Sequence, residues 1–173
     1  MGIEYLEYYT VEDFEKWEGD WELIRGVPYA MAPFALVSHQ RLSLKIAKEF
    51  NKNVCKNCEA LMKVEVEFSK DTVVSPDVIG ICNLKEEKIK RAPEVIFEVV
   101  SKGSIKRDEL IKFELYEKEA VKYYVIVYPD EKKAKVYELK DYKYVKRGDF
   151  FSGKFTFNLS ECNVEFDFDE VFN

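Results

Sequence analysis

The sequence predicts an α+β fold, a mixed α/β arrangement in which helices flank a mixed β-sheet and further antiparallel strands join it. Three observations lead to this class. Apolar runs typical of strands, either alternating or continuous, recur along the chain. Two longer segments show the spacing of helices instead. Most successive strands are close enough in sequence to pair as antiparallel neighbours, whereas one helix forms a crossover between strands. The chain has 173 residues without a break in composition, so we expect a single domain over residues 1–173.

Two helices and a hairpin are expected before residue 55. They are a helix over 10–18, a hairpin of strands 21–24 and 27–30, and a helix from 38 to about 51–53. Thr10 and Ser38 are favourable N-caps for the two helices. Arg25-Gly26 suits the hairpin turn. Apolar residues at helical spacing support the second helix, and these are Leu42, Ile46, Ala47 and Phe50.

Strands dominate the rest of the chain. Residues 60–68 alternate and predict one half-buried strand, whereas 73–81 and 93–100 are more continuously apolar, as interior strands are. Between them, we expect 85–91 to form a charged loop or a short helical turn. Residues 105–120 predict a helix that directs Leu110, Ile111, Phe113 and Leu115 to the core. A meander with a turn at Pro129-Asp130 and a final alternating pair complete the prediction, at 122–128, 134–139, 142–146, 155–159 and 164–168.

The charge of the chain is unevenly distributed. The formal net charge is −6, which taken alone argues against a strongly basic nucleic-acid binder. However, residues 1–24 hold eight acids and one base, and residues 158–173 hold five acids and no base, which leaves +6 on residues 25–157. We therefore expect a local basic face beside acidic ends, and DNA remains a possible partner.

No targeting or membrane segment is expected. Residues 1–10 carry acids and tyrosines without a cationic start or an apolar run, which argues against a signal peptide. No stretch approaches the roughly 18 continuous apolar residues of a membrane span. We expect a cytoplasmic protein without membrane contacts.

The four cysteines do not suggest a disulfide framework. Cys55 and Cys58 form a C-x-x-C near the expected end of a helix, whereas a thioredoxin-like motif would begin a helix after a strand. A structural zinc site needs a second pair of ligands, but Cys82 and Cys162 are isolated in sequence, and His39 is the only histidine. Ordinary cysteines or an incidental disulfide are the simpler interpretation.

Two carboxylates stand where the strand pattern predicts apolar residues. Glu98 interrupts the apolar run 95–100, and Asp77 follows Pro76 at the start of another apolar segment. A carboxylate is costly to bury unless it is paired or bound to a metal. Two antiparallel strands could bring the pair together, where Mg²⁺ or Mn²⁺ would relieve their repulsion. The alternative is that Glu98 lies at a strand end or faces solvent, and that Asp77 lies in a turn.

A cationic loop, 101–108, leads from Glu98 into the third helix. On this helix Asp108, Lys112 and Tyr116 recur at intervals of four and share one face. Lys112 could therefore lie near a metal-bound water or a phosphate. The alternative is an ordinary surface pair of Asp108 and Lys112, worth only about 0.3–0.5 kcal/mol, and the spacing alone favours this alternative.

Taken together, the motifs resemble those of the Uma2 family, formerly DUF820, within the PD-(D/E)xK nuclease fold. The resemblance covers nearly the whole chain. Each motif alone is weak, and their order and spacing carry the resemblance. The motifs are 10–14 (TVEDF), 21–26 (WELIRG), 38–40 (SHQ), 75–78 (SPDV), 93–101 (PEVIFEVVS), the helix face of Asp108, Lys112 and Tyr116, 121–126 (VKYYVI) and the Pro129-Asp130 turn.

The resemblance implies a restriction-endonuclease-like core and a metal-dependent endonuclease that hydrolyses phosphodiester bonds of DNA. Asp77 and Glu98 would be the metal-binding acids, with the Val99 carbonyl as a further ligand and Mg²⁺ or Mn²⁺ as the cofactor. In the usual nuclease motif a lysine lies two positions after the second acid, but here that residue is Val100. Uma2-like sequences share this departure, and Lys112 on the following helix would orient the attacking water or neutralise charge that develops on the phosphate.

The same resemblance assigns further residues. Glu22 matches an additional acid near the metal. His39 matches a frequent family residue, for which acid–base work and hydrogen bonding at the helix start are both open.

DNA contacts and an alternative function complete the set of expectations. Lys102, Lys106 and Arg107 are candidates for contacts with DNA phosphates, while Asp108 and Tyr116 are accessory candidates. Related nucleases often cut as dimers, so a homodimer is expected. The competing hypothesis is a binding module that keeps the nuclease fold without cutting.

Overall fold

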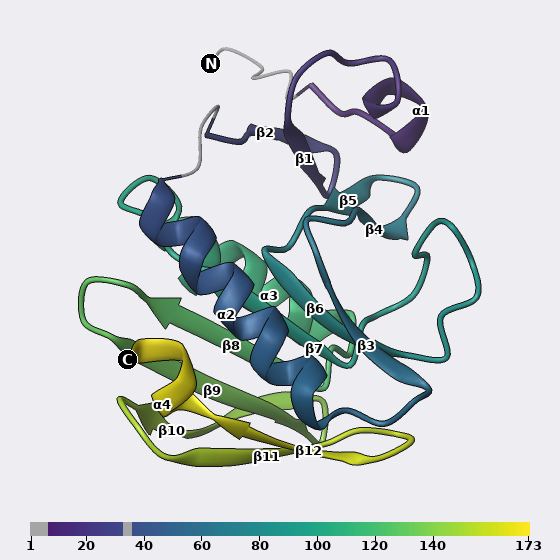
Figure 1. The fold of residues 1–173 in the computed structure, drawn as a ribbon. Coiled ribbons are helices and arrows are strands. Elements are labelled where there is room, and N and C mark those ends of the chain that lie inside the picture. Colours follow the sequence, from purple (N-terminus) through teal and green to yellow (C-terminus); the bar gives the residue numbers. More distant parts are fainter. Residues whose placement is uncertain (1–6, 33–35) are drawn as a thin grey trace.

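A six-stranded mixed sheet forms the centre of the fold in the computed structural model, which describes residues 7–32 and 36–173 (Figure 1). Within this sheet β7 and β8 pair in parallel, and the other neighbours are antiparallel. The parallel pair is joined through a π-helical turn, η1 (Arg107–Ile111), and α3 (Lys112–Lys118). The strands in spatial order are β10 (Lys143–Phe150), β9 (Lys133–Lys140), β8 (Tyr123–Tyr128), β7 (Val95–Val99), β6 (Val78–Cys82) and β3 (Cys58–Met62).

Two smaller sheets and three further helices surround this centre. A four-stranded sheet has the order β2 (Val27–Ala30), β1 (Trp21–Ile24), β5 (Thr72–Val74) and β4 (Val66–Ser69). A hairpin near the C-terminus consists of β11 (Lys154–Asn158) and β12 (Asn163–Asp167). The helices are α1 (Val11–Phe14), α2 (Val37–Asn53) and α4 (Phe168–Phe172). Among the described residues, none of the helices combines the length and the apolar composition that a membrane-spanning helix requires.

The core has two parts, one on each face of the central sheet. Side chains alternate between the faces of a strand, so Val95, Phe97 and Val99 of β7 join the cluster beneath α2 and the β11–β12 hairpin. Ile96 joins the cluster that contains residues of α3. The alternation therefore places Glu98 on the α3 side of the sheet.

The predicted α+β class is confirmed, and so are the first hairpin and the β8–β10 meander. Two strand predictions are wrong. Residues 60–68 form β3 and β4, and residues 73–81 contain β5 and β6, each pair divided between two sheets. Lys63 adopts a positive φ of 51° after β3, and Pro76 separates the other two strands. Alternation along the sequence continues across such a bend, so it does not reveal the change of sheet.

The helix predictions also need correction. The first helix ends at Phe14, and the second has Leu36 rather than Ser38 at its N-cap. In the third helix, η1 makes one wider turn, which leaves Leu110 66% exposed instead of in the core. Asp108 and Lys112 are buried instead. The expectation for residues 1–10 falls largely outside the described residues.

Gly80 allows α2 to approach the central sheet closely. It lies in the middle of β6, and a Cβ atom there would come within 2.5 Å of the ring of Phe50 from α2. Phe50 is completely buried, so its ring is confined by the packed core. A glycine within a strand often marks such a close approach.

We predict that Gly80→Ala lowers the free energy of unfolding by about 1–3 kcal/mol, because the ring of Phe50 must shift inside a packed core. Urea denaturation followed by circular dichroism measures this change. Gly103→Ala is the matched control, since a Cβ atom at Gly103 meets nothing within 4 Å. A loss as large in the control as in Gly80→Ala would contradict the packing argument.

Candidate active site

Asp77 and Glu98 converge at one end of the central sheet. Asp77 immediately precedes β6, and the pairing of Val78 with Phe97 places it opposite Glu98. The Asp77 amide donates to Glu98 Oε2 at 3.4 Å, and the Val99 amide donates to Asp77 Oδ2 at 2.7 Å. Asp77 is only 5% exposed and Glu98 only 3%. Glu98 is the penultimate residue of β7 and Asp77 lies in the bend before β6, but the alternative that Glu98 faces solvent is wrong.

Lys112 lies at the centre of a buried group of carboxylates. Its Nζ atom is 2.8 Å from Glu98 Oε1, 2.9 Å from Glu22 Oε1 and 3.8 Å from Asp108 Oδ1. Tyr116, one turn further along α3, donates from its hydroxyl to Glu98 Oε1 at 2.8 Å. Lys112 is 4% exposed, so the alternative of an ordinary surface pair is wrong.

Burial and neighbouring charges shift the pKa values of this group in different directions. Burial raises the pKa of Glu98 to about 8, although the Lys112 charge opposes that shift. Burial likewise raises the pKa of Asp108 to about 6. Burial alone would lower the pKa of Lys112, but the charges of Glu22, Glu98 and Asp108 outweigh it and raise the pKa. Lys112 therefore stays protonated and supplies the positive charge that these acids require.

Asp77 has a separate set of neighbours, His39 and Lys63. His39, in the first turn of α2, places Nε2 3.2 Å from Asp77 Oδ2, and Lys63 places Nζ 2.8 Å from Oδ1. Burial raises the pKa of Asp77, but the hydrogen bond with His39 and the charge of Lys63 outweigh it, so the pKa lies below its usual value. The His39 side chain thus contacts a site acid and does not cap the N-terminus of α2.

Lys63 is the site residue that sequence reasoning missed. It follows β3, whose last residue, Met62, pairs with Val78 of β6. That register places Lys63 beside Asp77, and the Lys63 amide donates to the Asp77 carbonyl at 3.3 Å. The sequence contains no direct signal for this contact, because residue 63 is one of several charged residues in an alternating segment. The pairing of β3 with β6 must be known first.

The oxygen atoms of the site fit a divalent cation such as Mg²⁺. Proteins usually hold Mg²⁺ with one or two carboxylates, while waters and phosphates complete its coordination. Asp77 and Glu98 provide two adjacent carboxylates. Glu22 Oε2 is also buried without a hydrogen-bond partner, which leaves acceptor capacity nearby. Among the described residues, no three acids or histidines of this group each bring a ligand atom within 4.8 Å of the other two, so a resident ion would depend on water or substrate oxygens.

A cleft of about 1080 Å³ opens over these groups. Asp77, Glu98, Val99 and Lys112 are among its lining residues, as are His39 and Lys63. The loop after β7 forms part of its wall, where Lys102 lines the cleft and Lys106 is exposed outside the lining.

Arg107, the third expected phosphate contact, lines the cleft but is already engaged with the first hairpin. Its Nη2 donates to the Ala30 carbonyl at 3.4 Å, and its guanidinium lies 4.9 Å from the centre of the Tyr29 ring. Its Nη1 is 3.6 Å from Glu22 Oε2.

Comparisons with known proteins bear on this arrangement. The Uma2 family model, described as "Putative restriction endonuclease", matches residues 7–164. A crystal structure from Anabaena variabilis ATCC 29413, titled as a putative nuclease belonging to DUF820, is similar with a TM-score of 0.75 at 17% identity. The similarity covers 95% of this chain and 97% of that chain and concerns the fold. No curated protein matches the chain.

We predict that Lys112→Met lowers the free energy of unfolding by about 3–5 kcal/mol, because it leaves buried carboxylates without their cation. Urea denaturation measures the loss. Lys143→Met is the matched control, since Lys143 forms an exposed pair with Glu117 at 2.9 Å and such pairs contribute little. Equal stabilities of the two variants would show that Lys112 is not required to balance the buried acids.

Proposed function

The chain belongs to the Uma2 family, and on this basis we propose that it is a metal-dependent endonuclease that hydrolyses phosphodiester bonds of DNA. The observation that carries the proposal is the contact of Asp77 with Glu98 at the floor of a cleft. Two buried, adjacent carboxylates open to a cleft are suited to holding Mg²⁺ or Mn²⁺ against a phosphate group.

Asp77, Glu98 and the Val99 carbonyl would hold the ion in this proposal. A bound divalent ion supplies Lewis-acid polarisation of the phosphoryl oxygen and a water of lowered pKa. The protein's own residues orient these ligands. The Val99 amide and His39 fix the Asp77 carboxylate, and Lys112 with Tyr116 fixes Glu98.

The two lysines of the site take different roles in this proposal. Lys112 is buried among carboxylates, so it acts as a positioning residue that holds Glu98 in place. The Lys63 side chain is 40% exposed and lines the cleft, so its ammonium can turn toward a phosphate and neutralise charge that develops there. Lys63 therefore supplies the substrate-facing charge that the family resemblance predicts for Lys112.

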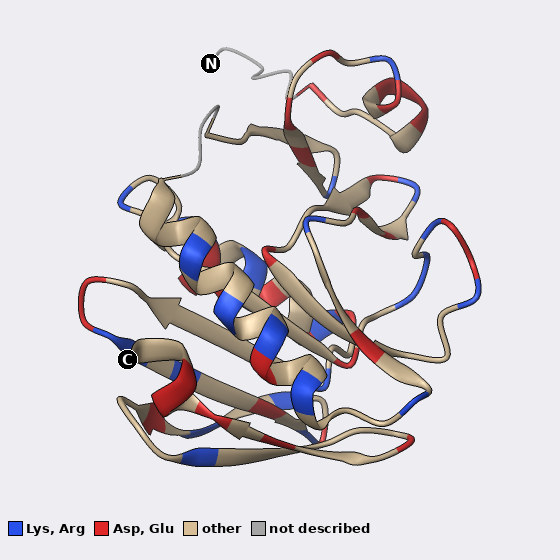
Figure 2. Cartoon of the chain, viewed as in Figure 1, with Lys and Arg blue, Asp and Glu red and all other residues tan. Residues whose placement is uncertain are grey.

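A basic stripe along α2 supports DNA as the substrate. Its four residues are spaced by four, three and four positions, and they are Arg41, Lys45, Lys48 and Lys52. Figure 2 shows basic residues along this helix, which also supplies His39 to the site. Such a row suits contacts with a phosphate backbone, which give affinity without sequence specificity. A homodimer, in which two sites act on the two strands of a duplex, is part of the proposal.

A second candidate is a nucleic-acid-binding module that keeps this fold without cutting. The enclosed position of Lys112 favours it, because three carboxylates surround Nζ and leave the expected catalytic lysine without access to substrate. The two functions differ in whether the folded protein cuts DNA or only binds it.

We predict that the purified protein cuts DNA with Mg²⁺ or Mn²⁺, and that Asp77→Asn and Glu98→Gln each reduce the rate by at least about 100-fold. These changes remove charges that would hold the metal and stabilise the transition state. A plasmid-nicking assay measures the rate. Glu170→Gln is the matched control, because Glu170 is an exposed carboxylate on α4.

Wild-type protein that binds DNA without cutting it would identify the binding module instead. Cutting that is equal in wild type and in both site variants would point to a contaminating nuclease. Lys63→Met separates the roles of the two lysines, since it should slow cutting while leaving the folded structure intact.

We predict that Arg41→Gln combined with Lys48→Gln weakens DNA binding and reduces its salt dependence. Each lost phosphate contact should lower the slope of log K against log salt by about 0.9. Fluorescence anisotropy without divalent metal measures binding while the DNA stays intact. The combination of Lys118→Gln and Lys140→Gln is the control, because both lysines are exposed and the net charge changes equally. Equal loss in the two pairs would reject α2 as the DNA-binding surface.

A further inference from the structure

Four cysteines from separate segments meet at the opposite end of β6 from the candidate active site. Asp77 precedes this strand and Cys82 ends it, so about 16 Å of extended chain separates the two places. Cys55 follows α2, Cys58 begins β3, and Cys162 precedes β12. The fold thus supplies the second pair of sulfur ligands that the C-x-x-C motif lacks in sequence.

The cysteines form two disulfides, Cys55–Cys162 and Cys58–Cys82. The sequence offered no pairing for them, because one bond spans 107 positions and the other 24. The tertiary structure makes both bonds possible. The register of β3 with β6 places Cys58 directly opposite Cys82, and the turn between β11 and β12 carries Cys162 to Cys55.

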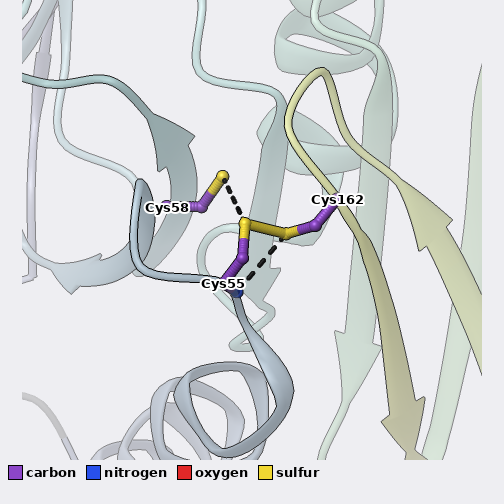
Figure 3. Close-up of side chains that lie close together, drawn as sticks. All are labelled: Cys55, Cys58 and Cys162. Carbon is purple, nitrogen blue, oxygen red and sulfur yellow. Dashed lines mark hydrogen bonds between the residues drawn. A yellow bond between two sulfur atoms is a disulfide. The ribbon is translucent and has the colours of Figure 1, made fainter.

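The two disulfides are close enough to form one cluster of sulfur atoms. Figure 3 shows the Cys58 sulfur directed toward the Cys55–Cys162 bond, and the Sγ atoms of Cys55 and Cys58 are 3.6 Å apart. The sulfurs of Cys55, Cys58 and Cys162 all lie within 4.8 Å of one another. Zinc with four thiolates at about 2.3 Å places its ligand atoms roughly 3.8 Å apart. The 3.6 Å between the Cys55 and Cys58 sulfurs is therefore close to the separation of two ligands in a tetrahedral thiolate site.

The surroundings also suit thiolate ligands. The Cys55 amide donates to Cys162 Sγ at 3.3 Å, and such a donor stabilises negative charge on sulfur. Cys58 and Cys82 are buried. Glu94 Oε2 is 3.4 Å from Cys82 Sγ and adds negative charge, so four thiolates at this place would require a cation.

We propose that the reduced protein binds one Zn²⁺ ion through Cys55, Cys58, Cys82 and Cys162. Each disulfide would accept two electrons and two protons from a dithiol, which itself becomes a disulfide. The four resulting thiols then lose four protons as their sulfurs coordinate Zn²⁺. Once the Cys58–Cys82 bond is broken, the Cys82 sulfur is free to move away from Cys58 to its own position around the metal.

The site is structural, because four protein ligands leave no position for water or substrate. It would connect the end of α2, the β3–β6 edge and the β11–β12 hairpin, as the two disulfides do. The hairpin contributes Phe157 and Phe166 to the core beneath α2. By holding the hairpin in place, the site would therefore support the part of the core on the α2 side of the central sheet.

The test begins with protein that is purified anaerobically with a dithiol reductant and loaded with Zn²⁺. After gel filtration, elemental analysis should find one zinc per chain. The double variant Cys55→Ser with Cys58→Ser should retain less than one tenth of that amount. Replacement of zinc by Co²⁺ in the wild type should give the visible absorption of tetrahedral thiolate-bound cobalt, which does not depend on any variant folding correctly.

The double variant Asp77→Asn with Glu98→Gln distinguishes this ion from one at the candidate active site. It should keep its full zinc content, so the outcome does not depend on the proposed nuclease function. The proposal is overturned if folded wild-type protein shows four free thiols and no bound zinc. It is equally overturned if the bound metal is lost from the Asp77–Glu98 variant and kept in the cysteine variant.

Discussion

The buried ammonium group of Lys112 is the interaction on which the arrangement of the site depends. It contacts Glu22 from the four-stranded sheet, Glu98 from the central sheet and Asp108 from η1. Three separate elements therefore meet at one positive charge. Taking these charges out of water is costly, and the cost is recovered only when every member has its partner. The network consequently specifies how the elements meet more than it adds to net stability.

The site combines this network around Lys112 with a second network around Asp77, which is more accessible to solvent through Lys63. Asp77 lies beside His39 and Lys63, whereas Glu98 lies beside Lys112. Burial and like charges raise the pKa of Glu98, while His39 and Lys63 lower that of Asp77. Two adjacent acids thus have opposite pKa shifts at the floor of one cleft, which is typical of functional sites.

Much of the site could be predicted because some residue types conflict with their local pattern. Asp77 and Glu98 stand out as carboxylates in apolar segments, and burying them requires a partner. Lys63 produces no such conflict, since a lysine is ordinary in an alternating segment. Helical periodicity predicts Leu110 in the core because it assumes regular turns, whereas the wider turn of η1 changes which side chains face inward.

The sequence by itself determined the α+β class, the local hairpins and the two acids, because these follow from side-chain periodicity and the cost of buried charge. Only the tertiary structure decided which strands share a sheet, and therefore which distant residues become neighbours. The register of β3 with β6 alone places Lys63 beside Asp77 at one end and Cys58 beside Cys82 at the other. Strand pairing depends on contacts between distant segments, and a single sequence does not record which of the possible pairings buries the most surface.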